Sequence, residues 1–170
     1  MKNIVIIMLA CIAITSCQNT TSEPAAAPGY LNAGGERVNA YDGDPANLAL
    51  VDAYIDAHNT RDLEAIASMN IDSTEMLGGF KVINSLGDVV EGVETHKNTL
   101  AAWFDAENPQ WNTYFAYSMK VDGQLGEWVI TGHKLTRTVD GEETSSYDIL
   151  DIYIENGKIG GFWVYTRNAK

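Results

Sequence analysis

The second half of the chain alternates apolar and polar residues with a period of two, which is typical of strands in a half-buried sheet. Asp-Gly and Asn-Gly pairs interrupt this alternation at three places and are turn signals. The last pair, Asn156-Gly157, separates two runs rich in β-branched and aromatic residues and predicts a tight hairpin. The pattern predicts antiparallel strands over residues 111–121, 125–139, 144–154 and 159–166.

Apolar residues in the middle of the chain recur every three or four positions and predict helices over residues 46–60, 63–69 and 92–107. Asp62 can cap the second helix, and Asn108-Pro109 ends the third. Between them, residues 72–86 predict a short strand or an irregular hairpin. Helices followed by an antiparallel meander are typical of an α+β domain with its helices on one face of the sheet.

The first residues predict a targeting signal. A short positive start precedes an apolar run over residues 4–14, which is too short to span a bilayer. Ser16 and Cys17 follow, and a small residue before a cysteine resembles the lipobox of bacterial lipoproteins. The resemblance implies cleavage after residue 16 and acylation (palmitate) of Cys17. Gln18, in place of an aspartate, favours the outer membrane facing the periplasm; the alternative is a plain secretory signal.

Residues 17–43 are rich in Thr, Ala, Pro, Gly and Asn and have no sustained period, so they predict a flexible tether. Asp44 and Pro45 then suit the start of the first helix. We therefore expect a signal peptide over residues 1–16, a tether over 17–43 and one domain over 44–170.

Composition limits the class of partner. Hydrophobic residues make up 45% of the chain, enough for a core, and the formal charge of -12 argues against nucleic acid. No metal-binding spacing, phosphate loop or nucleophile elbow is present in the sequence, so we expect neither a metal nor a cofactor. His58 and His96 fall on helical apolar stripes and are interpreted as core or rim residues.

Three motifs carry a resemblance to a known family: Asn59-Thr60-Arg61-Asp62, Glu91-Gly92-Val93-Glu94 and Glu155-Asn156-Gly157-Lys158-Ile159. Together with the order of elements they resemble the NTF2-like superfamily, most closely its SnoaL-like and ketosteroid-isomerase-like branch. The resemblance implies a curved sheet wrapped around helices, with a conical pocket. Members include isomerases, polyketide cyclases, epoxide hydrolases and binding domains, so the fold does not decide the function. The last strand lacks the terminal carboxylate of several such enzymes, which weakens the hypothesis of an epoxide-hydrolase mechanism.

Strand alternation predicts which polar groups face the pocket. Asp148 beside His133 would orient the imidazole as a general base. Alternatively, an apolar pocket would raise the pKa of Asp148 and make it the base, with Tyr117 donating a hydrogen bond to the developing enolate. We therefore take Asp148, His133 and Tyr117 as candidate catalytic residues.

Structural roles compete with this chemistry. Asp148 could pair with Lys134 or Arg137 across the strands. If the alternation is displaced by one residue, Asp151 and Tyr153 face the pocket in its place.

The favoured function is binding of a small apolar or amphipathic molecule, with Phe115, Thr131 and Trp103 in contact with it. The alternatives are an isomerase, cyclase or hydrolase, and a non-catalytic adaptor whose pocket is filled by aromatic residues such as Phe104. Trp128, on the face opposite His133, indicates a homodimer through the outer face of the sheet.

Overall fold

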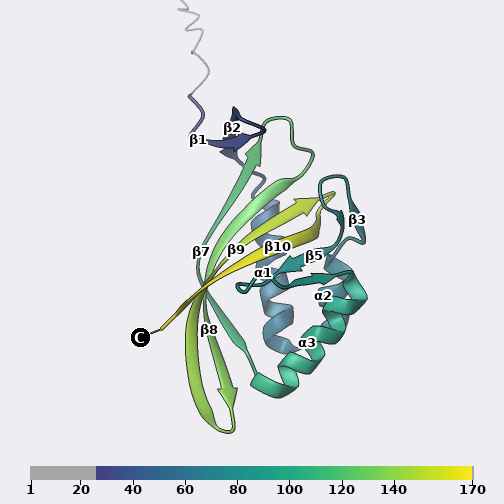
Figure 1. Ribbon diagram of the computed structural model, residues 1–170, viewed down its shortest axis with the longest axis vertical. Helices are drawn as coiled ribbons and strands as arrows, with labels where there is room; N and C mark the ends of the chain where they lie inside the picture. Colours follow the sequence, from purple (N-terminus) through teal and green to yellow (C-terminus); the bar gives the residue numbers. More distant parts are fainter. Residues whose placement is uncertain (1–25, 170) are drawn as a thin grey trace, which may run out of the picture.

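The computed structural model describes residues 26–169, so the expected signal peptide over 1–16 and Cys17 lie outside the described residues (Figure 1). The helices are α1 (Ala46–Thr60), α2 (Leu63–Met69) and α3 (Val93–Glu107). The strands are β1 (Gly29–Ala33), β2 (Glu36–Asp42), β3 (Ser73–Thr74), β4 (Gly78–Gly79), β5 (Lys81–Ile83), β6 (Val89–Glu91), β7 (Gln110–Val121), β8 (Glu127–Val139), β9 (Glu142–Glu155) and β10 (Lys158–Asn168).

One curved sheet forms the body of the domain, in the order β1-β2-β7-β8-β9-β10-β5-β6. The three helices lie on the same side of it (Figure 1). All pairings in this sheet are antiparallel except that of β10 with β5, which is parallel. The α+β prediction is confirmed, and the four long strands begin and end within two residues of the predicted positions.

Local chemistry explains where the strands turn. Asn156 and Gly157 have φ angles of 54° and 69°, and Asp140 and Gly141 have φ angles of 52° and 82°. Positive φ at both central residues is the geometry of a two-residue hairpin, which Asn-Gly and Asp-Gly adopt with little strain. The predicted hairpins therefore form at both places.

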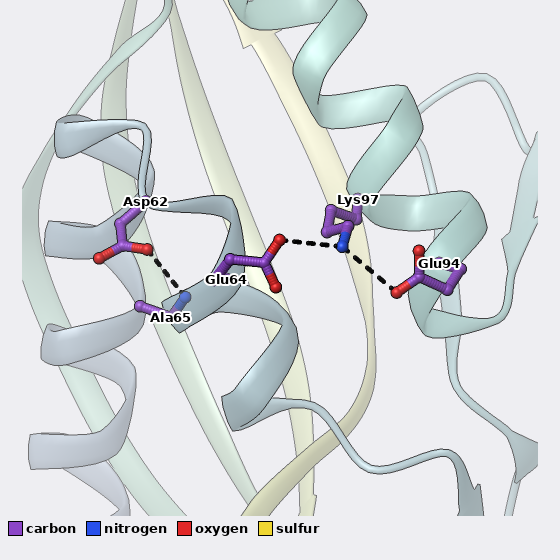
Figure 2. Close-up of polar contacts among 5 residues, drawn as sticks. All are labelled: Asp62, Glu64, Ala65, Glu94 and Lys97. Atoms are coloured by element: carbon purple, nitrogen blue, oxygen red, sulfur yellow. Dashed lines mark hydrogen bonds and ion pairs between the residues drawn. The ribbon is translucent and has the colours of Figure 1, made fainter.

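Capping residues set the helix boundaries. α1 ends where Arg61 adopts a left-handed conformation. α2 begins after Asp62, whose carboxylate accepts a hydrogen bond of 2.9 Å from the backbone N–H of Ala65 (Figure 2). Beside this cap, Lys97 of α3 lies 3.1 Å from Glu64 and 3.4 Å from Glu94. Solvent screens these ion pairs, so the cap contributes more to α2 than they do.

The core lies between the helices and the inner face of the sheet. Val129, Ile152 and Phe162 are register partners across β8, β9 and β10 and are all buried. Val51 of α1 and Ile66 of α2 pack into the same cluster. Burial of this apolar area is the main term that holds the helices on the sheet.

The prediction of a flexible tether over 17–43 is wrong for residues 29–42, which form the hairpin β1–β2. Gly34 and Gly35 have positive φ angles at its turn, and β2 pairs with β7 from Ala40 to Asp42. Most side chains of the hairpin are exposed, so it leaves little apolar periodicity in the sequence. Backbone hydrogen bonds to the edge of the sheet hold it in place.

No helix among residues 26–169 is both long and apolar enough to cross a membrane.

Candidate functional site

A cavity of about 560 Å³ lies between the helices and the inner face of the sheet. Its wall is mostly apolar and strongly aromatic, formed by Tyr54, Leu100, Trp103, Trp111, Leu135, Leu150, Phe162 and Val164. Leu86 and Asn168 are exposed residues that also line it, and they mark its mouth. The volume is within the range of about 300–1,000 Å³ that is common for small-molecule sites.

Asp148 lines this cavity from β9, as the alternation of the strand predicts. It is 3% exposed and accepts a hydrogen bond of 3.3 Å from the hydroxyl of Ser146. Burial raises the pKa of Asp148, and hydrogen bonds from Thr166 and Ser146 and the charge of Arg137 oppose that rise. A buried carboxyl group with a raised pKa is a candidate for proton transfer.

His133 is the register partner of Asp148 on β8, yet it does not line the cavity. It is fully buried, and its Nδ1 lies 3.0 Å from the hydroxyl of Thr113. Burial lowers its pKa to about 4, so the ring is neutral at pH 7. Among the described residues, no hydrogen bond or ion pair joins His133 to Asp148. The carboxylate–imidazole pair that the sequence suggested is therefore not formed.

Tyr117 and Phe115 were expected to face the pocket, and this prediction is wrong. A bulge shifts the register of β7 and β8 between Thr113, which opposes His133, and Phe115, which opposes Gly132. One extra residue reverses the alternation, so both aromatic residues lie on the outer face. They are 42% and 40% exposed, and the Tyr117 hydroxyl donates a hydrogen bond of 2.7 Å to Asp42.

The other two predicted ligand contacts, Trp103 and Thr131, have different positions relative to the cavity. Trp103 lines the cavity, and its contact with a ligand stays a prediction. Thr131 is buried outside the wall, where its hydroxyl donates a hydrogen bond of 2.9 Å to the backbone carbonyl of Phe115. Phe104 packs in the core and leaves the cavity open, contrary to the filled pocket that an adaptor requires.

The competing structural roles of Asp148 are not observed. Arg137 pairs instead with Glu107 of α3, at 3.5 Å, and Lys134 is exposed. Asp151 lies on the opposite face of β9, where Tyr165 donates a hydrogen bond to it. The inward carboxylate of β9 is therefore Asp148.

Of the helical wall of the site, the sequence predicted only Trp103. Tyr54 and His58 of α1 and His96 of α3 line the cavity. Burial lowers the pKa of His58 to about 4 and that of His96 to about 3. Helical periodicity placed these histidines on the apolar stripe, but periodicity cannot distinguish a core position from a cavity wall. Residues 26–169 contain no cluster of three His, Cys, Asp or Glu side chains able to hold a metal ion.

No protein-family model matches the sequence, and a comparison with curated proteins finds no match. Solved structures do match. A cystatin-fold protein from Novosphingobium aromaticivorans is 25% identical, with a TM-score of 0.52 over 69% of this chain and 96% of that one. An LEH-like epoxide hydrolase from M. tuberculosis is 12% identical, with a TM-score of 0.59 over 72% and 83% of the two chains.

A protein assigned as a SnoaL-like polyketide cyclase, from Jannaschia, is 17% identical, with a TM-score of 0.58 over 74% of this chain and 90% of that one. These likenesses define the class of fold. The chain has an NTF2-like cone, in which a curved sheet wraps around helices. The fold expected from the sequence is thereby confirmed, and the activities of the neighbours remain their own.

Proposed function

We propose that this domain binds a small apolar or amphipathic molecule inside its cone. The observation that carries the proposal is the open cavity of about 560 Å³ with a mostly apolar, aromatic wall. Apolar walls with a few placed polar groups are the usual composition of ligand sites.

The charges of the wall favour a ligand without a strong charge of its own. Arg137 is the single Lys or Arg among the residues that line the cavity, and Glu107 balances it. His58 and His96 are neutral at pH 7, because burial lowers the pKa of each. An anionic ligand would lose its hydration without gaining an unpaired cation.

Native mass spectrometry of the purified protein tests the proposal. We expect a bound small molecule on the wild type and its loss from Val164→Phe, since Val164 lines the cavity and a larger side chain takes up its volume. Val139→Phe is the matched control, because Val139 is exposed at the end of β8. Equal retention by both variants, or no ligand on the wild type, contradicts ligand binding.

The second candidate is an enzyme of isomerase, cyclase or hydrolase type that uses Asp148. The raised pKa of this cavity-wall carboxyl group favours it as an acid or base. Asp148→Asn should abolish turnover of any substrate found and leave the fold intact. Asp151→Asn, on the outer face of the same strand, should keep full turnover; unchanged turnover in Asp148→Asn removes Asp148 from the mechanism.

We also propose that two copies associate through the outer face of the sheet. Tyr114, Phe115, Tyr117 and Tyr165 on β7 and β10 are exposed, and exposed aromatic area is typical of a partner surface. Sedimentation velocity should give a dimer that Tyr114→Glu dissociates. A monomeric wild type contradicts this part of the proposal.

The anchor and location rest on the sequence alone. We propose that Cys17 carries the acyl chains that hold the domain at the outer membrane, facing the periplasm. Cys17→Ser should move the protein from the membrane fraction to the soluble fraction, and mass spectrometry of the wild type should detect the acylated cysteine. An unmodified Cys17 in the membrane fraction contradicts lipid anchoring.

A further inference from the structure

His58 has a single available tautomer. Its Nδ1 lies 2.7 Å from the backbone carbonyl oxygen of Tyr54, one turn earlier in α1. A carbonyl oxygen can only accept a hydrogen bond, so Nδ1 carries the proton. Burial lowers the pKa of His58 to about 4, and the neutral ring has no second proton at pH 7. Nε2 is therefore a hydrogen-bond acceptor with a lone pair.

The ring of His58 is held by packing. Its centroid lies 4.4 Å from that of Tyr54, 5.3 Å from that of Trp111 and 6.1 Å from that of Phe104. All three contacts are steeply inclined, so they brace the imidazole on several sides and limit its rotation. The direction of the Nε2 lone pair is thus set before any ligand binds.

Nε2 of His58 has no hydrogen-bond partner among residues 26–169, and the side chain lines the cavity. Two other imidazole nitrogens, Nδ1 of His96 and Nε2 of His133, also have no partner, but they are sealed off inside the protein. Nε2 of His58 is not one of the sealed atoms. Nε2 of His96, which also lines the cavity, is not a sealed atom either, but no hydrogen bond from the described residues fixes the tautomer of that ring. His58 is therefore the cavity histidine whose Nε2 is fixed as an acceptor by a hydrogen bond at Nδ1.

The rest of the wall defines the complementary molecule. The carboxyl group of Asp148 is a second hydrogen-bond acceptor in the wall. Arg137 forms an ion pair with Glu107. Trp103 and Trp111 meet nearly perpendicular, at 80° and 5.3 Å between ring centroids, and form an aromatic corner. Acceptors in an aromatic wall suit a neutral aromatic molecule that carries a hydrogen-bond donor.

We propose that His58 is a specificity-determining residue of the cavity, whose Nε2 accepts a hydrogen bond from the hydroxyl group of a neutral hydroxylated aromatic ligand. The inference rests on the proposed ligand-binding function and names its ligand class. A molecule without a hydrogen-bond donor would exclude water from Nε2 and leave this acceptor without a partner, which is unfavourable. A carboxylate would bring a negative charge toward a lone pair and toward Asp148.

Isothermal titration calorimetry of the full-length protein at pH 7 tests the inference with four probes: 2-naphthol, naphthalene, 2-methoxynaphthalene and 2-naphthoate. We expect 2-naphthol to bind about tenfold more tightly than naphthalene, the size of one good hydrogen bond. In His58→Phe, which keeps an aromatic ring of similar size, this ratio should fall to about one, for the same reason. His133→Asn is the control, because it removes an imidazole outside the wall, and it should keep the wild-type ratio.

Other results of the titrations would each overturn a specific part of the inference. A ratio that His58→Phe leaves unchanged, or that His133→Asn lowers equally, overturns the role of His58. Tightest binding of 2-naphthoate overturns the ligand class. If neither naphthalene nor 2-naphthol binds to the wild type, the proposed cavity binding of aromatic ligands fails, and the inference fails with it. The wild type alone gives a check that needs no variant: equal affinity for 2-naphthol and 2-methoxynaphthalene, which lacks the donor, overturns the inference.

Discussion

Glu127 joins the sheet to the beginning of α1, and its removal tests how the helical wall of the cavity is held. Its Oε2 accepts hydrogen bonds from the backbone N–H of Asp44, at 2.6 Å, and from the side-chain amide of Asn47, at 2.8 Å. A carboxylate at this end of a helix also interacts favourably with the helix dipole. Both donors lose their partner in Glu127→Ala.

The expected loss follows from these two bonds. Hydrogen bonds to charged groups contribute about 1.5–3 kcal/mol each, and partial exposure of Glu127 puts this pair near the lower end, so we expect a loss of about 2–3 kcal/mol. In a domain of this size the melting temperature should then fall by roughly 4–12 °C. Glu142→Ala, at an exposed position on β9, is the matched control and should change stability by less than about 0.5 kcal/mol.

Thermal unfolding followed by circular dichroism at pH 7 gives both values, and a double-mutant cycle with Asn47→Ala isolates one of the two bonds. We expect coupling of about 1 kcal/mol or more between Glu127 and Asn47. A stabilising role for Glu127 is refuted if Glu127→Ala unfolds at the same temperature as Glu142→Ala. A stabilising role for its bond to Asn47 is refuted if the cycle shows no coupling, because the contact would then contribute nothing to the attachment of α1.

Three further predictions concern stability. Because the pKa of Asp148 is raised in the folded protein, ionisation opposes folding as the pH rises above the ordinary value of 3.8. Asp148→Asn should therefore be more stable than the wild type in urea at pH 7, and the difference should disappear below pH 3.8; a less stable variant at pH 7 contradicts the raised pKa. Asp62→Ala removes the cap on Ala65 and should cost about 1 kcal/mol, measured by thermal unfolding, whereas Asp62→Asn should retain most of the stability. Ile152→Ala opens a hole in the fully buried core and should cost about 2–5 kcal/mol in urea unfolding; a cost below about 1 kcal/mol would mean that the site collapses around the smaller side chain.

The elements were predictable because their causes are local. The period of apolar residues, the Asp62 cap and the Asn156-Gly157 turn act within a few residues, and α1, α2 and the last hairpin occur where they indicate. The β1–β2 hairpin was not predictable in this way. It depends on backbone pairing with β7, an element about 80 residues later in the chain, and it buries few side chains.

The candidate site was predictable only in part. Asp148 faces the cavity because β9 keeps its alternation throughout. Phe115 and Tyr117 face outward because a single extra residue in β7 reverses every side chain after it. Gly132 on the paired strand allows this packing, since a Cβ there would overlap the ring of Phe115. A bulge depends on two strands together, so the alternation of one strand cannot reveal it.

The sequence alone therefore determined the kind of domain: its helices, its long strands, its turns and the inward carboxylate at Asp148, all set by interactions between near neighbours. Tertiary structure decided what the domain presents to a ligand. It made α1 and α3 one wall of a cavity with His58 in it, buried His133 outside that wall and turned Tyr117 to the outer face of the sheet. Those outcomes depend on how distant surfaces fit against one another, which no pattern of adjacent residues contains.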